Sequence, residues 1–364
     1  MMKERIIFLA GVLLLLVGGL TSCSKDDDDN KEPDVVTATS ATKQVMVVFA
    51  PSQLGDKGYA DRVMDGIILT ENAQEKLNKQ IVDVDYISLS DALFTIGSME
   101  QWIANARNPF SGVDYEQRLL VLTESYMLEW LLNSNVKLRD NDEVLVLKAV
   151  KEDLEIAENL ELGNRLHTLN ISAARSVRRF SEYMDARIAY EQERGRGDEI
   201  DANSINVLRL YDEEEMAYRD EICETLQELR GEELEINAFT LSALENYGTY
   251  SPLLEENIVQ AAYDSGMMLN AKVNETGTIF ALVDLGMANL SFDYYLMRQP
   301  SFSFTTLMLD AQPSSLRRFV IDRRFDTAVN GWVTQWMETA VGTMPQTTSL
   351  SDENYCQDNI TTEL

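Results

Sequence analysis

The sequence predicts an α/β protein with two lobes, each built on a mainly parallel sheet flanked by helices. Two observations lead to this prediction. Apolar strand-like runs alternate with amphipathic helical stretches, a pattern typical of parallel sheets with both faces covered. The chain also has 364 residues, of which 45% are hydrophobic, and this suffices for two domains of ordinary size.

The first lobe is expected over residues 45–150, with residues 272–300 returning to it. Its opening run VMVVFA is apolar at successive positions, as in a strand buried on both faces. The other strands expected here are residues 81–89, 118–122, 143–147 and 278–283. Four helices are expected in this lobe. One begins near Tyr59, one spans residues 98–106, one ends at Trp130 and one ends at Met297.

The second lobe is expected over residues 151–271, and residues 315–344 are a candidate segment that returns to it. Its strands are predicted at residues 166–171, 205–210 and 236–241, and a further strand at residues 302–309. Helices are predicted at residues 173–193, 213–229, 254–269 and 315–339. The tail, residues 345–364, is rich in Thr and Asp and is expected to be mobile.

The N-terminus has the pattern of a bacterial export signal over residues 1–22, with Lys3 and Arg5 before an apolar core. That core is shorter than the roughly 20 residues of a membrane span. The following Leu-Thr-Ser-Cys resembles a lipobox, which implies lipidation of Cys23 and membrane attachment. Residues 23–44 read as a polar tether. Its run of four Asp behind Cys23 resembles the surface-export signal of Bacteroidetes lipoproteins, which favours the outer face of the outer membrane over the periplasm.

Composition excludes several classes of function. Acidic residues outnumber Lys and Arg by 61 to 31, a net charge of −30, which argues against binding to nucleic acid. The single histidine, His167, lies in a predicted strand, where a structural role is expected; neither a metal nor a cofactor is expected. Whether Cys223 and Cys356 pair stays open.

The candidate site begins after the first strand, where the loop and helix start carry Asp56, Tyr59 and Asp61. Ligands of open α/β sheets bind at the carboxyl ends of strands, beside such helix starts. A carboxylate can accept two hydroxyl hydrogen bonds, and an aromatic ring offers an apolar face. The alternatives are purely structural roles, in which Asp56 caps the helix and Tyr59 packs in the core.

The run GDKGYADRVMDG resembles the signature G-D-K-S-F-N-Q-S-A-W-E-G of the basic membrane protein family. Members of this family are lipoproteins with a type I periplasmic-binding-protein-like fold, and they include purine nucleoside receptors. The stretches ALVDLGMAN, LMLDAQ and VIDRRFD are similar to later motifs of that family. The resemblance implies a stacking role for Tyr59, ribose binding by Asp310, a ligand-proximal cation at Arg323, and a binding turn at Gly286.

One departure from this signature bears on the ligand. Ala60 stands where the family usually has Asn, so a polar partner for a purine is missing. An unsatisfied buried polar group costs about 1–3 kcal/mol, which argues against purine nucleoside specificity.

The leading hypothesis is a non-catalytic solute-binding lipoprotein that holds a nucleoside-like or sugar-like ligand between two lobes. An envelope transporter component is a candidate partner. The alternative is an envelope scaffold lipoprotein that keeps the fold without a small ligand. An enzyme ranks third, since a glycosidase needs two carboxylates about 5–10 Å apart, which sequence alone does not place.

Overall fold

The computed structural model describes most of the chain after residue 41. The described residues are 42–49, 54, 58–76, 82–88, 96–105, 114–149, 154–155, 157–209, 221–231, 233–240, 255–284, 289–298, 304–311 and 313–361. The predicted export signal, the predicted lipidation site Cys23, the acidic run behind it and the predicted binding residues Asp56 and Gly286 lie outside these residues.

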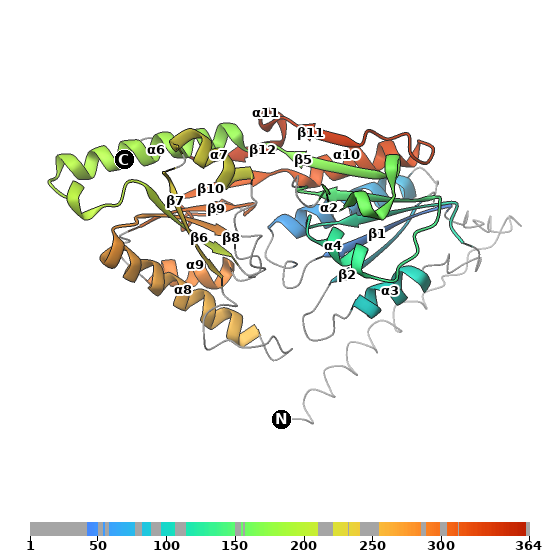
Figure 1. Ribbon diagram of the computed structural model, residues 1–364, viewed down its shortest axis with the longest axis horizontal. Coiled ribbons are helices and arrows are strands. Elements are labelled where there is room, and N and C mark those ends of the chain that lie inside the picture. Colours follow the sequence, from blue (N-terminus) through green and yellow to red (C-terminus); the bar gives the residue numbers. More distant parts are fainter. Residues whose placement is uncertain are drawn as a thin grey trace, which may run out of the picture. The chain divides into compact units, whose positions relative to one another are not determined.

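Sheet A contains six parallel strands in the order β11-β5-β4-β3-β1-β2. They are β1 (Lys43–Phe49), β2 (Val82–Ser88), β3 (Gln117–Leu122), β4 (Asp142–Leu147), β5 (Leu166–Ile171) and β11 (Thr347–Leu350). Helices α2 (Tyr59–Lys76) and α10 (Phe325–Met337) lie side by side on one face, and α3 (Ile96–Asn105) and α4 (Met127–Asn133) lie on the other (Figure 1).

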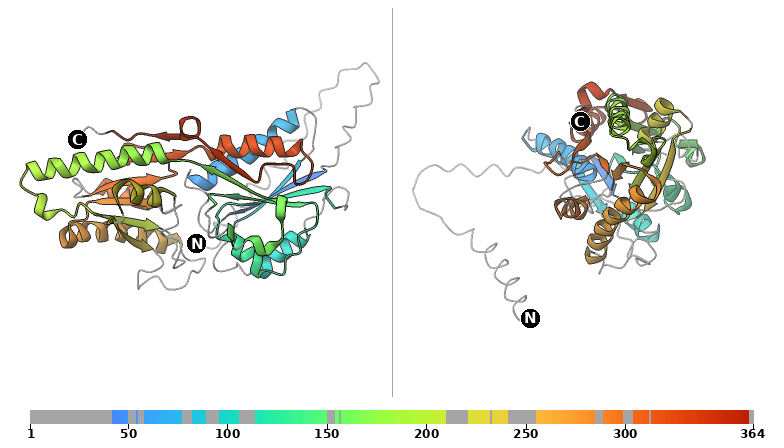
Figure 2. Two further views of the ribbon diagram at one scale, coloured as in Figure 1. Left: turned by 45° about the horizontal axis from the view of Figure 1, so that its top comes forward. Right: turned by 90° about the vertical axis from the view of Figure 1, so that its left-hand side faces the viewer.

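Sheet B also contains six strands, in the order β12-β10-β9-β8-β6-β7, and only the β10–β12 pair is antiparallel. They are β6 (Ser204–Arg209), β7 (Glu235–Thr240), β8 (Phe280–Asp284), β9 (Thr305–Leu309), β10 (Phe319–Arg323) and β12 (Cys356–Asp358). Helices α6 (Ala174–Glu193) and α7 (Glu221–Arg230) cover one face, and α8 (Glu255–Thr276) and α9 (Asn289–Arg298) the other (Figures 1 and 2).

Alternation along each strand explains the three layers. In β1, Val45 and Val47 pack toward α2 and α10, whereas Met46 and Val48 pack toward α3 and α4. Since both faces are buried, the strand is apolar throughout, as the sequence indicates. The prediction of two mainly parallel sheets flanked by helices is confirmed.

The chain passes between the sheets three times: from β5 to β6, from β10 to β11, and from β11 to β12. The short elements on these routes include α11 (Asp352–Tyr355). The turns η1 (Glu158–Leu160), η2 (Gly163–Arg165) and η3 (Gly197–Glu199) complete the described elements.

The assignment of segments to lobes needs correction. β5 pairs with β4 in sheet A, although the sequence-based boundary assigns it to the second lobe. β8, expected to return to the first lobe, lies between β6 and β9 in sheet B. α10, part of the candidate segment for a return to the second lobe, packs against α2 instead. Apolar periodicity identifies a buried strand or helix face, but it does not identify the partner.

The C-terminal segment is also corrected. Residues 347–358 form β11, α11 and β12, and are not a mobile tail. Each of the two strands lies at a sheet edge, where the short, half-exposed sequences TTSL of β11 and CQD of β12 are compatible with pairing. In this arrangement Cys356 lies opposite Arg323, and both Cys223 and Cys356 are free thiols.

A buried polar network holds α10 and the loop after it to sheet A. The carboxylate of Glu143 accepts hydrogen bonds from Gln117 Nε2 at 2.5 Å, Trp336 Nε1 at 2.6 Å and the Gly342 amide at 2.8 Å. His167 Nε2 lies 3.0 Å from the same carboxylate, so the predicted structural role of this histidine fits its position in β5. Glu143 and His167 are both buried.

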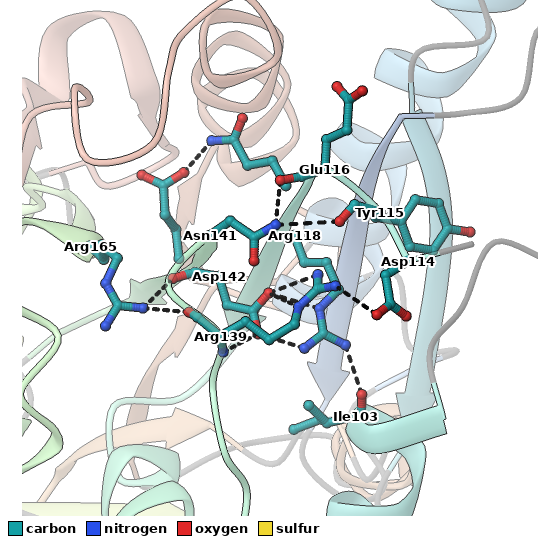
Figure 3. A network of polar contacts seen from close by, with 11 residues as sticks. Ile103, Asp114, Tyr115, Glu116, Arg118, Arg139, Asn141, Asp142 and Arg165 are labelled. Carbon is teal, nitrogen blue, oxygen red and sulfur yellow. Dashed lines mark hydrogen bonds and ion pairs between the residues drawn. The ribbon is translucent and has the colours of Figure 1, made fainter.

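A second network ties the amino ends of β3 and β4 together (Figure 3). Arg118 and Arg139 both converge on Asp142, with N–O distances of 2.8 and 3.0 Å from their Nε atoms. Arg165 donates to the backbone carbonyls of Arg139 and Asp142. These cations are satisfied by protein groups at the sheet end opposite to the predicted site, which indicates a structural role.

No helix among the described residues is long and apolar enough to cross a membrane.

Candidate functional site

Asp310 and Arg323 form a buried pair at the carboxyl ends of β9 and β10. Arg323 donates from Nε to Oδ1 at 2.8 Å and from Nη2 to Oδ2 at 2.6 Å, a bidentate arrangement. The two residues expose only 3% and 4% of their surface. Both come together because β9 and β10 are parallel neighbours whose carboxyl ends share one edge of sheet B. Two of the predicted binding residues are therefore in contact.

Tyr59 begins α2 beside the carboxyl ends of sheet A. Its hydroxyl donates to the Thr123 carbonyl at 2.6 Å, and its ring meets Phe325 edge to face with centroids 4.8 Å apart. The side chain is buried. Burial raises the pKa of the Tyr59 hydroxyl well above its ordinary value, and the charges of Glu124 and Asp310 add to this rise.

Lys148 covers one face of that ring. Its Nζ lies 3.8 Å from the Tyr59 ring centroid and 3.0 Å from Glu124 Oε1. Lys148 directly follows β4, and Glu124 follows β3 by two residues. The ammonium is thus held between a carboxylate and an aromatic face, which fixes it at the strand ends of sheet A.

The charges of the two sheets act on one another at this point. Burial lowers the pKa of Lys148, but Glu124, Asp284 and Asp310 more than offset this effect, so the net pKa is raised. Asp284 ends β8 and Asp310 follows β9, both in sheet B, whereas Lys148 belongs to sheet A. The strand ends of both sheets therefore contribute to one electrostatic cluster.

The backbone is left-handed at two members of this cluster. Lys148 has φ 52° and Asp310 has φ 48°. A lysine adopts this conformation at a cost of about 1–2 kcal/mol, whereas Asp and Asn adopt it more readily. Among the described residues, Glu161 is the remaining non-glycine residue with positive φ, and it caps a short turn. Strained residues that the fold retains are concentrated at functional sites.

The other sequence predictions fall as follows. Asp61 is half-buried in the first turn of α2, where the helix dipole favours a negative charge. Ala60 exposes 1% of its surface and packs in the apolar core beside Val63. The structure thus brings Tyr59, Asp310 and Arg323 into one cluster, and it places Ala60 in the core of the sheet A layer.

Sequence reasoning missed Lys148 and Glu124 as members of the cluster. Both stand one or two residues after a buried strand, which is a signal that could have identified them. A lone Lys after a strand is nonetheless common, and only the pairing of β3 with β4 shows that it meets Glu124. Among the described residues, no group of three or more His, Cys, Asp or Glu is arranged to hold a metal ion.

Solved structures share this fold. A crystal structure described as an ABC transporter system solute-binding protein from Aeropyrum pernix K1 matches with a TM-score of 0.52 and 14% identity, covering 87% of this chain and 76% of that one. An ABC sugar transporter subunit from Rhodobacter sphaeroides 2.4.1 matches with a TM-score of 0.50 and 11% identity, covering 88% and 98%. No family model and no curated protein matches the chain.

The class of fold follows from these observations. Two mainly parallel six-stranded sheets, each between helix layers and joined by three crossings, form the type I periplasmic-binding-protein-like fold. At identities this low, the likeness establishes the architecture alone.

Proposed function

We propose that the chain is a non-catalytic solute-binding protein that takes a small, hydroxyl-rich ligand between the carboxyl ends of its two sheets. The observation that carries this proposal is the buried Asp310–Arg323 pair, whose guanidinium lies 5.6 Å from the ring of Phe325, the residue that packs against Tyr59. Carboxylates accept and cations donate hydrogen bonds, so this cluster matches a sugar hydroxyl in both respects.

Two further considerations support a sugar-like ligand. Lys148 covers one face of the Tyr59 ring, and the ring also contacts Phe325. These contacts suit a ring that lines the site better than a ring that stacks on a nucleobase. The similar structures are a solute-binding protein and a sugar transporter subunit. A nucleoside-like ligand, which the resemblance to the basic membrane protein family implies, is the competing class.

The proposal also covers attachment and partners. Lipidation at Cys23 would anchor the protein in the outer membrane, with the outer face favoured, and a transporter component of the envelope would receive the ligand. Metabolic labelling with a fatty acid tests the anchor: label on the native chain and none on Cys23→Ala supports it. An unlabelled native chain would remove it.

Binding is tested by a thermal-shift screen of the full chain against neutral sugars, polyols and nucleosides. Ligand at 100 times its dissociation constant adds about 2.7 kcal/mol of stability, a visible shift. Asp310→Asn should abolish the shift, and Asn tolerates the left-handed backbone that Asp310 adopts.

The control is Asp293→Asn, which alters a comparable pair with Arg317, 2.8 Å long, near the start of β10. It should leave binding unchanged. If no sugar or nucleoside shifts the native chain, the solute-binding proposal fails, and a scaffold role in the envelope takes its place.

A further inference from the structure

We propose, on the basis of the solute-binding function above, that Lys148 is an internal counter-cation that makes this site select uncharged, hydroxyl-rich ligands over amine-bearing ones. Lys148 follows β4, and its ammonium lies 3.0 Å from Glu124 Oε1 and 3.8 Å from the Tyr59 ring centroid. It therefore occupies the position in which an amine of a ligand would find both a carboxylate and an aromatic face.

The charges of the cluster explain why such a cation is needed. Three strand ends bring carboxylates: Glu124 after β3, Asp284 at the end of β8 and Asp310 after β9. Arg323 donates to both carboxylate oxygens of Asp310 and so offsets one of these three negative charges. The charged groups that act on Lys148 are these three acids and one base, Arg323, so without Lys148 the acids are in excess, in a chain of net charge −30. Such a site would attract cations.

The placement of Lys148 is specific. Its backbone adopts φ 52°, a conformation that costs a non-glycine residue free energy, and its side chain is mostly buried rather than extended into solvent. A lysine that served only solubility would require neither. The strained turn directs the ammonium to Glu124 and Tyr59, and an amine on the ligand would then meet a fixed like charge.

The selectivity is measurable with matched probes. Glucose and glucosamine, and galactose and galactosamine, differ by one hydroxyl exchanged for an amine that is charged below neutral pH. Titration calorimetry of the full chain at pH 6.5 should show at least tenfold tighter binding of the neutral member of a pair. Lys148→Met, which keeps an unbranched apolar stem, should move this ratio at least tenfold toward the amino sugar.

Three further variants sharpen the test. Glu124→Gln removes an acid and should move the ratio in the opposite direction. Lys272→Met removes an exposed lysine paired with Glu275 at 2.9 Å and should leave the ratio unchanged. Lys148→Gln, also neutral, supplies a second reading of the lost charge if Lys148→Met does not fold.

The outcomes separate the two proposals. Neutral-sugar binding with a ratio that stays within twofold in both Lys148 variants would overturn the role of Lys148 and leave solute binding intact. Preference of the native chain for the amino sugar would overturn it as well. Absence of binding of all four probes and of the wider sugar and nucleoside panel would overturn the solute-binding function itself, and the role of Lys148 with it.

Discussion

Arg62 Nη2 lies 2.5 Å from Asp322 Oδ2, and this ion pair links α2, which covers sheet A, to β10 in sheet B. The same guanidinium lies 3.9 Å from Asp326 at the start of α10. The contact sits at the crossing from β10 to α10 and next to Arg323 in the chain. A change in the charge of Asp322 therefore acts both on the junction of the sheets and beside the candidate site.

We expect Asp322 to make the protein more stable in mild acid than at neutral pH. Burial raises the pKa of Asp322 from 3.8 to about 6, and the Arg62 charge only partly opposes this. The folded chain then holds more protons than the unfolded chain between these values. Stability from this group thus falls as pH rises from about 4 to 7, by up to about 3 kcal/mol for a shift of two units.

The measurement is chemical unfolding at pH 5 and pH 7.5 for the native chain and Asp322→Asn. The difference between the two chains isolates Asp322 from other titrating groups. Asp322→Asn should be less sensitive to pH over this range. Equal pH dependence of both chains would contradict a raised pKa at this position.

A second prediction concerns the buried carboxylate of Glu143. Burial alone would raise its pKa, but hydrogen bonds from His167, the Gly342 amide, Trp336 and Gln117 hold the pKa below its ordinary value. Its stabilising effect is present above the unfolded pKa of 4.5 and is lost as pH falls through the folded value. Glu143→Gln should cost about 3–5 kcal/mol at pH 7, because it breaks a buried charged network.

Unfolding in denaturant checks this value. Glu129→Gln, an exposed change on α4, is the control and should stay within about 0.5 kcal/mol. A cost for Glu143→Gln as small as that of the control would mean that the network does not hold α10 and its following loop to sheet A.

A third prediction separates packing from ligand contact at Tyr59. Its hydroxyl donates to the Thr123 carbonyl, so Tyr59→Phe should lower stability by about 1–2 kcal/mol. Affinity for a sugar found in the screen should change less than threefold, because the ring and its contact with Lys148 remain. Tyr86→Phe, at a side chain that is 53% exposed, is the control for stability.

Calorimetric affinity and denaturant unfolding are measured on the same samples. A loss of affinity above tenfold in Tyr59→Phe with stability unchanged would assign the hydroxyl to the ligand, and the packing role would be wrong.

The fold was accessible from the sequence because apolar runs and helical periods are local. The buried strands β1, β3 and β4 are predicted directly from their runs of consecutive apolar residues. The sheet to which each strand belongs could not be predicted from the sequence. The apolar sequence of β8 suits the centre of either sheet, and strand pairing is a long-range property. The segment after residue 345 reads as a tail because its strands are short, half-exposed and at sheet edges.

The candidate site was partly accessible for a related reason. Asp310 and Arg323 were identified through a resemblance to family motifs, and Tyr59 through its position after the first strand. The bidentate contact between Asp310 and Arg323, and the placement of Lys148 over Tyr59, depend on which strands are neighbours. Neither composition nor local spacing contains that information.

The close packing of α2 on α10 gives a prediction with opposite signs at two glycines. A Cβ on Gly66 would lie 2.5 Å from the Asp326 carbonyl oxygen, whereas a Cβ on Gly331 would meet no atom within 4 Å. Gly66→Ala forces the helices apart and should cost about 1–3 kcal/mol. Gly331→Ala sits within α10 and should stabilise by about 0.5–1 kcal/mol through helix propensity and a less flexible unfolded chain.

Denaturant unfolding of both variants provides the comparison. Because α10 connects β10 of sheet B to the sheet A layer, Gly66→Ala should also weaken sugar binding, while Gly331→Ala should preserve it. Equal stabilities for the two variants would show that α2 and α10 have room to adjust, and the predicted cost of a side chain at Gly66 would be wrong. A stabilised Gly66→Ala would contradict the close approach itself.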